Sequence, residues 1–309
     1  MKLAGDIGGT KVFLALVDAA GQLSHEYRLA SVDFSDFESL LAAYLAGLPA
    51  PPDGGCLAVA GPVADDGRSA RITNLPWIIN AAALEARFGL GRLTLINDFA
   101  GAALGVTVTG SDQLICLQAG EPRADGVKLV IGAGTGLGMA ILVHHSGGWR
   151  VLPGEGGHVA FAPADELQLG IWQALRDEHG RVTCERVISG PGLVAIHHVL
   201  HGEPLDAAAI SARALAGDAA ARATATVFLA AYGAFAGDMA LAVMARGGVY
   251  LAGGIAAKVL PLLQTGGFLT AFNAKAEHAV LAQRMPVVVV TDEKLGLRGA
   301  ALAAQQSLD

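Results

Sequence analysis

The stretch Leu3-Ala4-Gly5-Asp6-Ile7-Gly8-Gly9-Thr10-Lys11-Val12 decides how the first half of the chain is interpreted. Its apolar flanks predict strands over Leu3–Ile7 and Val12–Val17, with a tight bend at Gly8-Gly9-Thr10 between them. A turn then leads to a third strand near Ser24–Ala30. Glycines allow positive φ and bring backbone N–H groups close to a ligand, so such a bend can cradle phosphate; an ordinary hairpin bend is the alternative.

The same pattern begins again about 125 residues later. Strands are predicted over Val127–Ile131 and Met139–Val143, with the glycine bend Gly132-Ala133-Gly134-Thr135-Gly136 between them, and a third strand over Trp149–Leu152. A duplicated unit predicts two similar α/β lobes that face each other across a cleft, whereas chance similarity of two glycine-rich hairpins is the competing explanation. The second bend lacks the third glycine of a dinucleotide fingerprint, and the chain contains no Walker motif.

The rest of the chain alternates between helices and short strands in its first half and is mostly helical in its second. With no Pro- or Ser-rich linker, we expect a small α/β domain over residues 1–107, completed by 297–309, and a large α/β domain over 108–296. The chain should cross between them near 106–110 and 294–298. Further helices are expected over 34–48, 81–88, 99–104, 168–178, 192–200, 207–214, 219–245 and 297–306, and strands over 56–60, 93–96, 249–252 and 287–291.

Composition limits the function classes. The 309 residues are 53% hydrophobic with a net charge of −7, which excludes intrinsic disorder. No basic run indicates nucleic-acid binding. The first residues contain no hydrophobic segment typical of a signal peptide, and the uncharged stretch 223–237 is shorter than the ~20 residues of a membrane helix, so we expect a cytoplasmic protein without a membrane partner. Three cysteines without metal-ligand spacing are expected to be buried thiols.

Three further segments carry polar residues in patterns that suit chemistry. Asn97-Asp98 follows an apolar strand, where open α/β sheets bind ligands; Asp98 is a candidate general base or, equally, a helix cap. Glu155 and His158 lie in a glycine-rich loop and suit hydrogen bonding to sugar hydroxyls, with a capped loop as the alternative. Glu185 is a further acidic candidate that, taken alone, is a helix-surface charge. Gly253-Gly254 follows a strand and suits the approach of a nucleoside or a strand-to-helix turn.

In their order and spacing, these motifs closely resemble the bacterial glucokinase family, within the sugar-kinase, chaperone and actin superfamily. The resemblance spans nearly the whole chain and is most specific over 153–163 and 185–193. It implies a two-lobed actin-like ATPase (ribonuclease H-like) α/β fold with a duplicated βββαβα core and a central cleft. The cysteine-rich zinc motif of repressor-like sugar kinases is absent, which favours the zinc-free branch. Lys11 stands where many members carry Asn.

The resemblance also implies a reaction and a site. The expected reaction is ATP-dependent phosphorylation of D-glucose to glucose 6-phosphate, a glycolytic step, in a cytoplasmic homodimer. Asp98 would take the proton from the 6-hydroxyl, and Asp6 would lie near Mg²⁺ and hold it through water. Glucose hydroxyls would be held by Asn97, Asp98, Glu155, His158 and Glu185, ATP phosphates by Gly5, Asp6, Ile7, Gly8, Gly9, Thr10, Gly132, Gly134, Thr135 and Gly136, and the nucleoside would border Gly253 and Gly254.

Rival functions within this fold are a kinase for another hexose or an N-acetylated amino sugar, and a non-catalytic sugar-sensing regulator. A regulator of this kind carries an N-terminal DNA-binding module, whereas the predicted phosphate-binding strand here begins at Leu3. A nucleotide-switch protein such as the chaperone relatives would not need the loop that contains Glu155 and His158.

Overall fold

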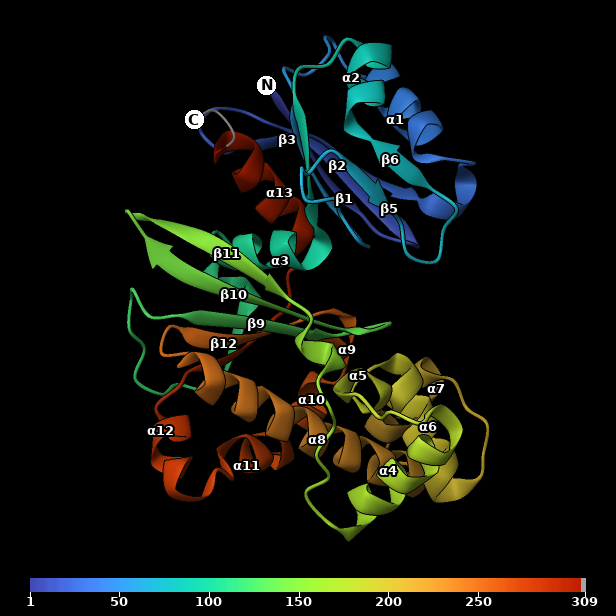
Figure 1. Cartoon of the computed structure of the whole chain (residues 1–309), viewed down its shortest axis with the longest axis vertical. Helices are drawn as coiled ribbons and strands as arrows, with labels where there is room; N and C mark the ends of the chain where they lie inside the picture. Colours follow the sequence, from blue (N-terminus) through green and yellow to red (C-terminus); the bar gives the residue numbers. More distant parts are fainter. Residues whose placement is uncertain (307–309) are drawn as a thin grey trace. The chain divides into compact units, whose positions relative to one another are not determined.

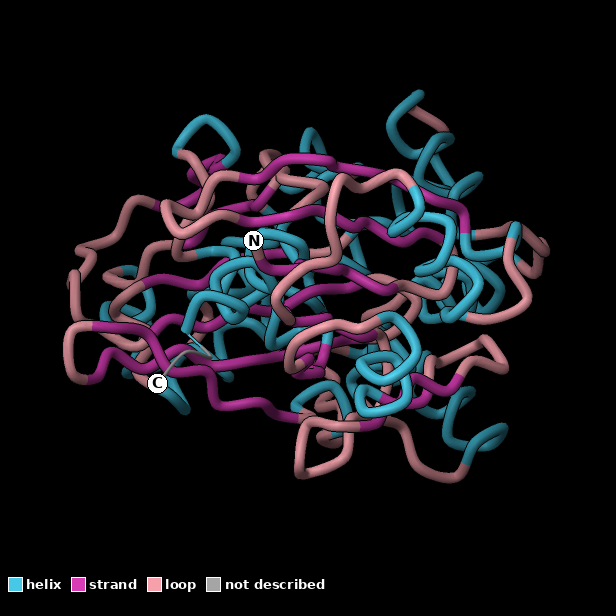
Figure 2. The backbone as a smooth tube through the Cα atoms, turned by 90° about the horizontal axis from the view of Figure 1, so that it is seen from above, coloured by secondary structure: helices cyan, strands magenta, loops and turns pink. Residues whose placement is uncertain are grey.

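A computed structural model describes residues 1–306 of the chain. The chain forms two compact units (Figure 1). Unit 1 comprises Met1–Ser111 and the C-terminal segment from Asp292, and unit 2 comprises Asp112–Thr291. The polypeptide therefore passes between the units twice. Figure 2 marks the strands of both units in magenta and the helices in cyan.

Unit 1 is built on a five-stranded sheet in the order β3-β2-β1-β4-β7. The first three strands form an antiparallel meander, and β4 and β7 extend it with parallel pairing next to β1. A two-stranded sheet of β5 and β6 lies in the same unit. The strands are β1 (Lys2–Ile7), β2 (Lys11–Val17), β3 (Leu23–Ala30), β4 (Gly55–Val59), β5 (Ser69–Arg71), β6 (Ile78–Asn80) and β7 (Leu93–Asn97).

Helices pack on this sheet in two hydrophobic clusters. One cluster joins the sheet to α1 (Phe37–Ala46) and α2 (Ala81–Phe88), and the other joins it to the C-terminal helix α13 (Leu295–Gln306). Helix α13 also packs closely on α3 (Asp98–Val106). The two helices approach at glycines: a Cβ added to Gly299 would collide with the carbonyl oxygen of Gly101. Glycine is therefore required for this backbone contact.

Unit 2 repeats the strand order of unit 1. Its six-stranded sheet has the order β11-β10-β9-β12-β13-β8, in which the antiparallel meander β9-β10-β11 and the parallel strands β12 and β13 correspond to the five strands of unit 1. Strand β8 is added antiparallel at the edge. The strands are β8 (Leu114–Gln118), β9 (Lys128–Ala133), β10 (Leu137–His145), β11 (Gly148–Gly154), β12 (Gly248–Ala252) and β13 (Val287–Val290). This repetition confirms the duplicated α/β core.

The core of unit 2 is dominated by α8 (Ala219–Val243), which packs against α6 (Gly190–His201), α7 (Ala207–Ala216) and α11 (Gly267–Asn273). By length and composition α8 could span a membrane, so the length expectation drawn from residues 223–237 does not hold for its 25 residues. More than half of its most apolar window is buried inside the protein, as in the core helix of a soluble domain. The other helices are α4 (Glu166–His179), α5 (Cys184–Val187), α9 (Gly254–Lys258), α10 (Leu260–Leu263) and α12 (Ala279–Gln283).

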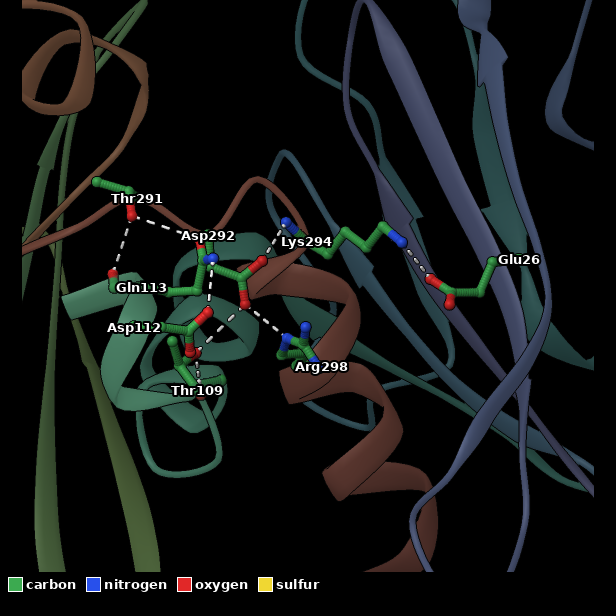
Figure 3. A network of polar contacts seen from close by, with 9 residues as sticks. Glu26, Thr109, Asp112, Gln113, Thr291, Asp292, Lys294 and Arg298 are labelled. Carbon is green, nitrogen blue, oxygen red and sulfur yellow. Dashed lines mark hydrogen bonds and ion pairs between the residues drawn. The ribbon is translucent and has the colours of Figure 1, made fainter.

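Local hydrogen bonds fix the chain on each side of the crossing at Thr291–Asp292 (Figure 3). On the unit 1 side, the Asp292 carboxylate accepts hydrogen bonds from Arg298 Nε at 2.5 Å and from the Lys294 backbone N–H at 2.9 Å. On the unit 2 side, the N–H and Oγ1 of Thr291 both donate to the carbonyl of Gln113, at 2.9 and 3.1 Å. Each crossing segment is thus anchored within its own unit.

The cysteine expectation is only partly correct. Cys56 and Cys184 are buried and free, and the pKa of each thiol is raised to about 12, by burial in both and also by the charge of Asp238 at Cys184. Cys116 is exposed because it lies on β8, the edge strand of the sheet.

Candidate active site

Asp6, Asn97 and Asp98 lie at one edge of the unit 1 sheet. In the parallel register, Asp6 of β1 is level with Ala58 of β4, which is level with Ile96 of β7. Asn97 ends β7 and Asp98 begins α3. The carboxyl ends of these strands therefore present three half-buried polar residues at the edge where open α/β sheets bind ligands.

The N-terminus of α3 is not capped by Asp98 alone. Asn97 is the N-cap of α3, with extended backbone angles, and its Oδ1 accepts a hydrogen bond from the Phe99 N–H at 2.9 Å. Its Nδ2 donates to the carbonyl oxygen of Gly61 at 3.3 Å. Asp98 is the first helical residue, and its Oδ1 also accepts from the Phe99 N–H, at 2.9 Å. A carboxylate in the first turn is stabilised by the positive end of the helix dipole.

Asp6 has a strongly perturbed carboxyl group. Its pKa is raised from 3.8 to about 7, mainly by burial and in addition by the negative charge of Asp98, whereas Lys11 acts to lower it. The carboxylate packs against the backbone at Gly296, where an added Cβ would lie 2.6 Å from Asp6 Oδ2. A cation beside two such carboxylates would favour their ionised forms.

No group of three or more His, Cys, Asp or Glu side chains within residues 1–306 is arranged to hold a metal ion. This donor set does not suit a resident metal with an all-protein shell. It suits a magnesium ion that keeps most of its water and arrives with substrate phosphates, which needs only one or two carboxylates. Asp6 can fill this role.

The glycine bend of unit 1 lies between β1 and β2. It is closed by a hydrogen bond from the Gly8 N–H to the Lys11 carbonyl at 3.0 Å, and the Gly8 carbonyl accepts from Ser31 Oγ at 2.9 Å. A Cβ on Gly8 would lie 2.9 Å from the Lys11 carbonyl oxygen, so the tight bend requires glycine there. Thr10 at its tip is exposed.

The glycine bend of unit 2 lies between β9 and β10 and accepts a hydrogen bond from another element of the unit. The Gly134 N–H closes the bend on the Gly136 carbonyl at 2.8 Å, while the Gly134 carbonyl accepts from the N–H of Gly190 at 2.7 Å. Gly190 begins α6, whose N-cap is Ser189. Thr135 at the tip is exposed, and space is open at the Gly134 Cα. The contact between Gly190 and this bend was not predicted from the sequence.

Glu185 lies against this second bend rather than on an open helix surface. Its Oε2 accepts a hydrogen bond from the Leu137 N–H at 2.8 Å, directly after the bend. A Cβ on Gly136 would be only 2.5 Å from the same oxygen. The interpretation of Glu185 as an unattached surface charge is therefore wrong.

The loop that contains Glu155 and His158 joins the same region. The two side chains are exposed, and Glu155 Oε2 lies 3.8 Å from His158 Nε2. Between them, Gly157 packs on the chain at the bend exit, since its Cβ would lie 2.1 Å from the Leu137 carbonyl oxygen. The next residue, Val159, accepts a hydrogen bond from the Cys184 N–H at 2.9 Å, which ties this loop to the helix of Glu185.

Gly253 and Gly254 form the turn between β12 and α9. Gly253 has a φ of 84°, and a Cβ there would lie 2.9 Å from the Ala133 carbonyl oxygen on β9. Gly254 is exposed, with open space at its Cα. The turn thus serves close packing at Gly253 and leaves an accessible backbone at Gly254.

The predicted site residues therefore form two groups. In unit 1 the structure brings Asp6, Asn97 and Asp98 to one sheet edge, beside the bend 8–10. In unit 2 it brings the bend 134–136, Glu185 and the loop 155–158 together around Leu137, a residue that sequence reasoning did not single out.

Known proteins match this chain along nearly its whole length. A family model described as Glucokinase matches residues 3–307. The chain belongs to the glucokinase family. A glucokinase of Pseudomonas aeruginosa is 40% identical over 318 residues, covering 99% of this chain and 95% of the relative. A glucokinase of Trichormus variabilis is 37% identical over 337 residues, covering 98% of each.

Solved glucokinase structures share the fold. A glucokinase from an Antarctic psychrotroph superposes with a TM-score of 0.88 at 33% identity, covering 99% of this chain and 98% of the other. A Balamuthia mandrillaris glucokinase in complex with glucose gives 0.83 at 23% identity, covering 98% and 93%. This glucokinase-family chain therefore has the two-lobed α/β architecture of actin-like sugar kinases, as the motifs predict.

Proposed function

We propose that this chain transfers the γ-phosphoryl group of ATP to the 6-hydroxyl of D-glucose. Family membership over nearly the whole chain supports a sugar kinase. The observation that carries the mechanism is the pair of coupled carboxylates, Asp6 and Asp98, at the carboxyl edge of the unit 1 sheet. Phosphoryl transfer needs positioning and charge stabilisation more than covalent chemistry, and these two groups divide the tasks.

Asp98 is the proposed general base. Its place at the start of α3 fixes the carboxylate by a hydrogen bond from the Phe99 N–H, which keeps it oriented for the 6-hydroxyl. It accepts the hydroxyl proton as the oxygen forms its bond to the γ-phosphorus and the bond to the β-phosphate oxygen breaks. Asn97, on the same edge, orients the sugar by a hydrogen bond to a neighbouring hydroxyl.

Asp6 is proposed to act on the nucleotide. The Asp6 carboxylate would hold the hydrated magnesium ion of MgATP, and the ion would offset the negative charge of the phosphates. The bends at 8–10 and 134–136 would bind the phosphates through N–H groups that do not close the bends, and Gly254, which has open space at its Cα, would border the nucleoside. An acidic chain with a net charge of −7 can thus bind a polyanion through backbone dipoles and a metal ion.

Glu155, His158 and Glu185 are proposed to hold glucose hydroxyls. The first two are exposed and lie on one loop, and that loop is tied to the helix that carries Glu185. Several polar contacts to hydroxyls give selectivity, because a sugar that lacks one hydroxyl leaves a polar group of the site unpaired. On the family pattern, we further propose a cytoplasmic homodimer that feeds glycolysis.

A coupled assay for glucose 6-phosphate, run with MgATP and a panel of hexoses and N-acetylated amino sugars, tests the proposal. We expect glucose to give the highest kcat/KM. A higher value for mannose or an N-acetylated sugar would assign another substrate, and ATP consumption without any sugar product would remove the kinase assignment. Size-exclusion chromatography with light scattering tests the dimer.

A further inference from the structure

The backbone of Leu137 is shared by two motifs of unit 2. Its N–H donates to Glu185 Oε2 at 2.8 Å, and its carbonyl is covered by Gly157 of the loop 155–158. Leu137 is also the residue at which the bend 134–136 returns to β10. The proposed phosphate-binding bend and the proposed sugar-binding loop therefore meet at one peptide segment.

The two carboxylate oxygens of Glu185 have different surroundings. Oε2 lies against Gly136 and takes the Leu137 N–H. Oε1 accepts no hydrogen bond from any other side chain or backbone group in the described part of the chain. One oxygen is thus committed to the bend, while the other remains available to a ligand hydroxyl.

The charge of Glu185 opposes what the bend is proposed to bind. A carboxylate in contact with Gly136 places negative charge beside backbone dipoles that would receive phosphate oxygens. It also occupies the Leu137 N–H, which is then not available to an anion. Such a charge would weaken phosphate binding at the bend for as long as Oε2 holds the Leu137 N–H.

We propose that Glu185 makes nucleotide binding depend on the sugar. This inference rests on the proposed function, in which Glu185 accepts a sugar hydroxyl. A hydroxyl that donates to Oε1 draws charge away from Oε2, loosens its hold on the Leu137 N–H and lowers the repulsion at the bend. Nucleotide then binds more tightly once sugar is present, and transfer of the phosphoryl group to water in an empty sugar site is suppressed. Glu185 is in this respect a positioning residue for the bend.

Isothermal titration with the magnesium complex of adenosine 5′-(β,γ-imido)triphosphate tests the coupling. In the wild type, saturating glucose should tighten nucleotide binding by about tenfold, within the 5- to 150-fold span typical of coupled sites. Glu185→Gln keeps the shape and an oxygen acceptor but removes the charge. Without sugar, this variant should bind the nucleotide about five- to tenfold more tightly than the wild type, and glucose should add less than about twofold.

Matched controls separate charge from packing. Glu185→Asp keeps the charge and should not bind the sugar-free nucleotide more tightly than the wild type. Glu166→Gln, in the first turn of α4, removes a charge elsewhere in unit 2 and should leave nucleotide affinity unchanged. Uncharged adenosine should bind equally to the wild type and to Glu185→Gln, because the proposed repulsion acts on phosphate.

A spectroscopic readout follows the same hydrogen bond. The Leu137 amide proton resonance should move upfield when glucose binds to the wild type, as its hydrogen bond weakens, and should not move in Glu185→Gln. Equal or weaker sugar-free nucleotide binding by a folded Glu185→Gln would overturn the inference. If the wild type binds glucose but its nucleotide affinity is the same with and without glucose, the coupling alone is overturned. If the wild type does not bind glucose, the proposed function is overturned as well.

Discussion

The two glycine bends occupy the same place in two sheets of the same strand order, yet they are held differently. In unit 1 the carboxylate near the bend, Asp6, comes from the strand that leads into it, and the bend is tied to Ser31. In unit 2 the carboxylate comes from Glu185, 48 residues beyond the Leu137 N–H that it binds, and the bend is tied to Gly190. The duplicated scaffold has thus kept its topology while its polar partners have diverged. Under the proposed function, metal and base chemistry would belong to unit 1 and regulation of the bend to unit 2.

Neutralising Asp98 is the strongest test of this division of roles between the two units. Asp98→Asn should lower kcat by roughly 10²–10⁴-fold, the usual contribution of a general base, while glucose and nucleotide affinities stay near those of the wild type. Steady-state kinetics and equilibrium binding on the purified variant check this. Near-normal turnover would show that unit 1 does not supply the base.

The packing of the sugar loop on the unit 2 bend can be tested at Gly157. Gly157→Ala places a Cβ against the Leu137 carbonyl oxygen, so the loop must shift away from the bend. We expect kcat/KM for glucose to fall about 10²-fold, as for a misplacement of about 1 Å, and the free energy of unfolding to fall by about 1–3 kcal/mol.

Gly170→Ala is the matched control. Gly170 lies inside α4 with open space around its Cα, so alanine should leave kinetics unchanged and stabilise the helix by about 0.5–1 kcal/mol. If both variants behaved alike in kinetics, the contact at Leu137 would have no functional role.

A smaller effect is expected at the exposed end of the sugar loop. His158→Ala should raise KM for glucose by about tenfold, the equivalent of roughly one hydrogen bond to a polar group, and leave KM for MgATP nearly unchanged. Initial rates at varied glucose and varied MgATP separate the two constants. An equal loss for both substrates would place His158 outside the sugar site.

The smallest expected change concerns the stability of unit 1. The Asp6 pKa of about 7 lies above its value of 3.8 in an unfolded chain, so the folded protein loses stability as pH rises from about 4 through 7 and Asp6 ionises. Asp6→Asn should therefore unfold with a free energy about 1–3 kcal/mol higher than the wild type at pH 8, with little difference at pH 4.

Urea unfolding at the two pH values measures this difference. Magnesium nucleotide should stabilise the wild type at pH 8 and stabilise Asp6→Asn less, because the bound cation favours the ionised carboxylate. A larger stabilisation of Asp6→Asn at pH 4 than at pH 8 would contradict the assigned perturbation.

Much of the architecture follows from local sequence. Apolar runs bounded by glycine predicted both meanders, and the helix predicted over 81–88 is α2 at its observed bounds. The short helices α9–α12 were missed because segments of four to seven residues carry too few turns to show a helical period. The edge strand β8 was missed as well, and Cys116 on it is exposed rather than buried.

The site was partly predictable for the same reason. Asn97 and Asp98 follow directly from a strand end, and the structure adds that Asn97 takes the N-cap. The contact of Glu185 with Leu137 could not be predicted, because it depends on how α5 packs beside the start of β10. Sequence spacing carries no information on that packing.

The central claim is that the strand-end carboxylates serve phosphoryl transfer to a hexose. Phosphorus NMR of the purified protein with MgATP and glucose tests it in one experiment. The ATP signals should decay while signals of ADP and glucose 6-phosphate grow in equal amounts, and inorganic phosphate should stay at background. Inorganic phosphate as the main product, or ATP that persists unchanged with glucose present, would contradict it.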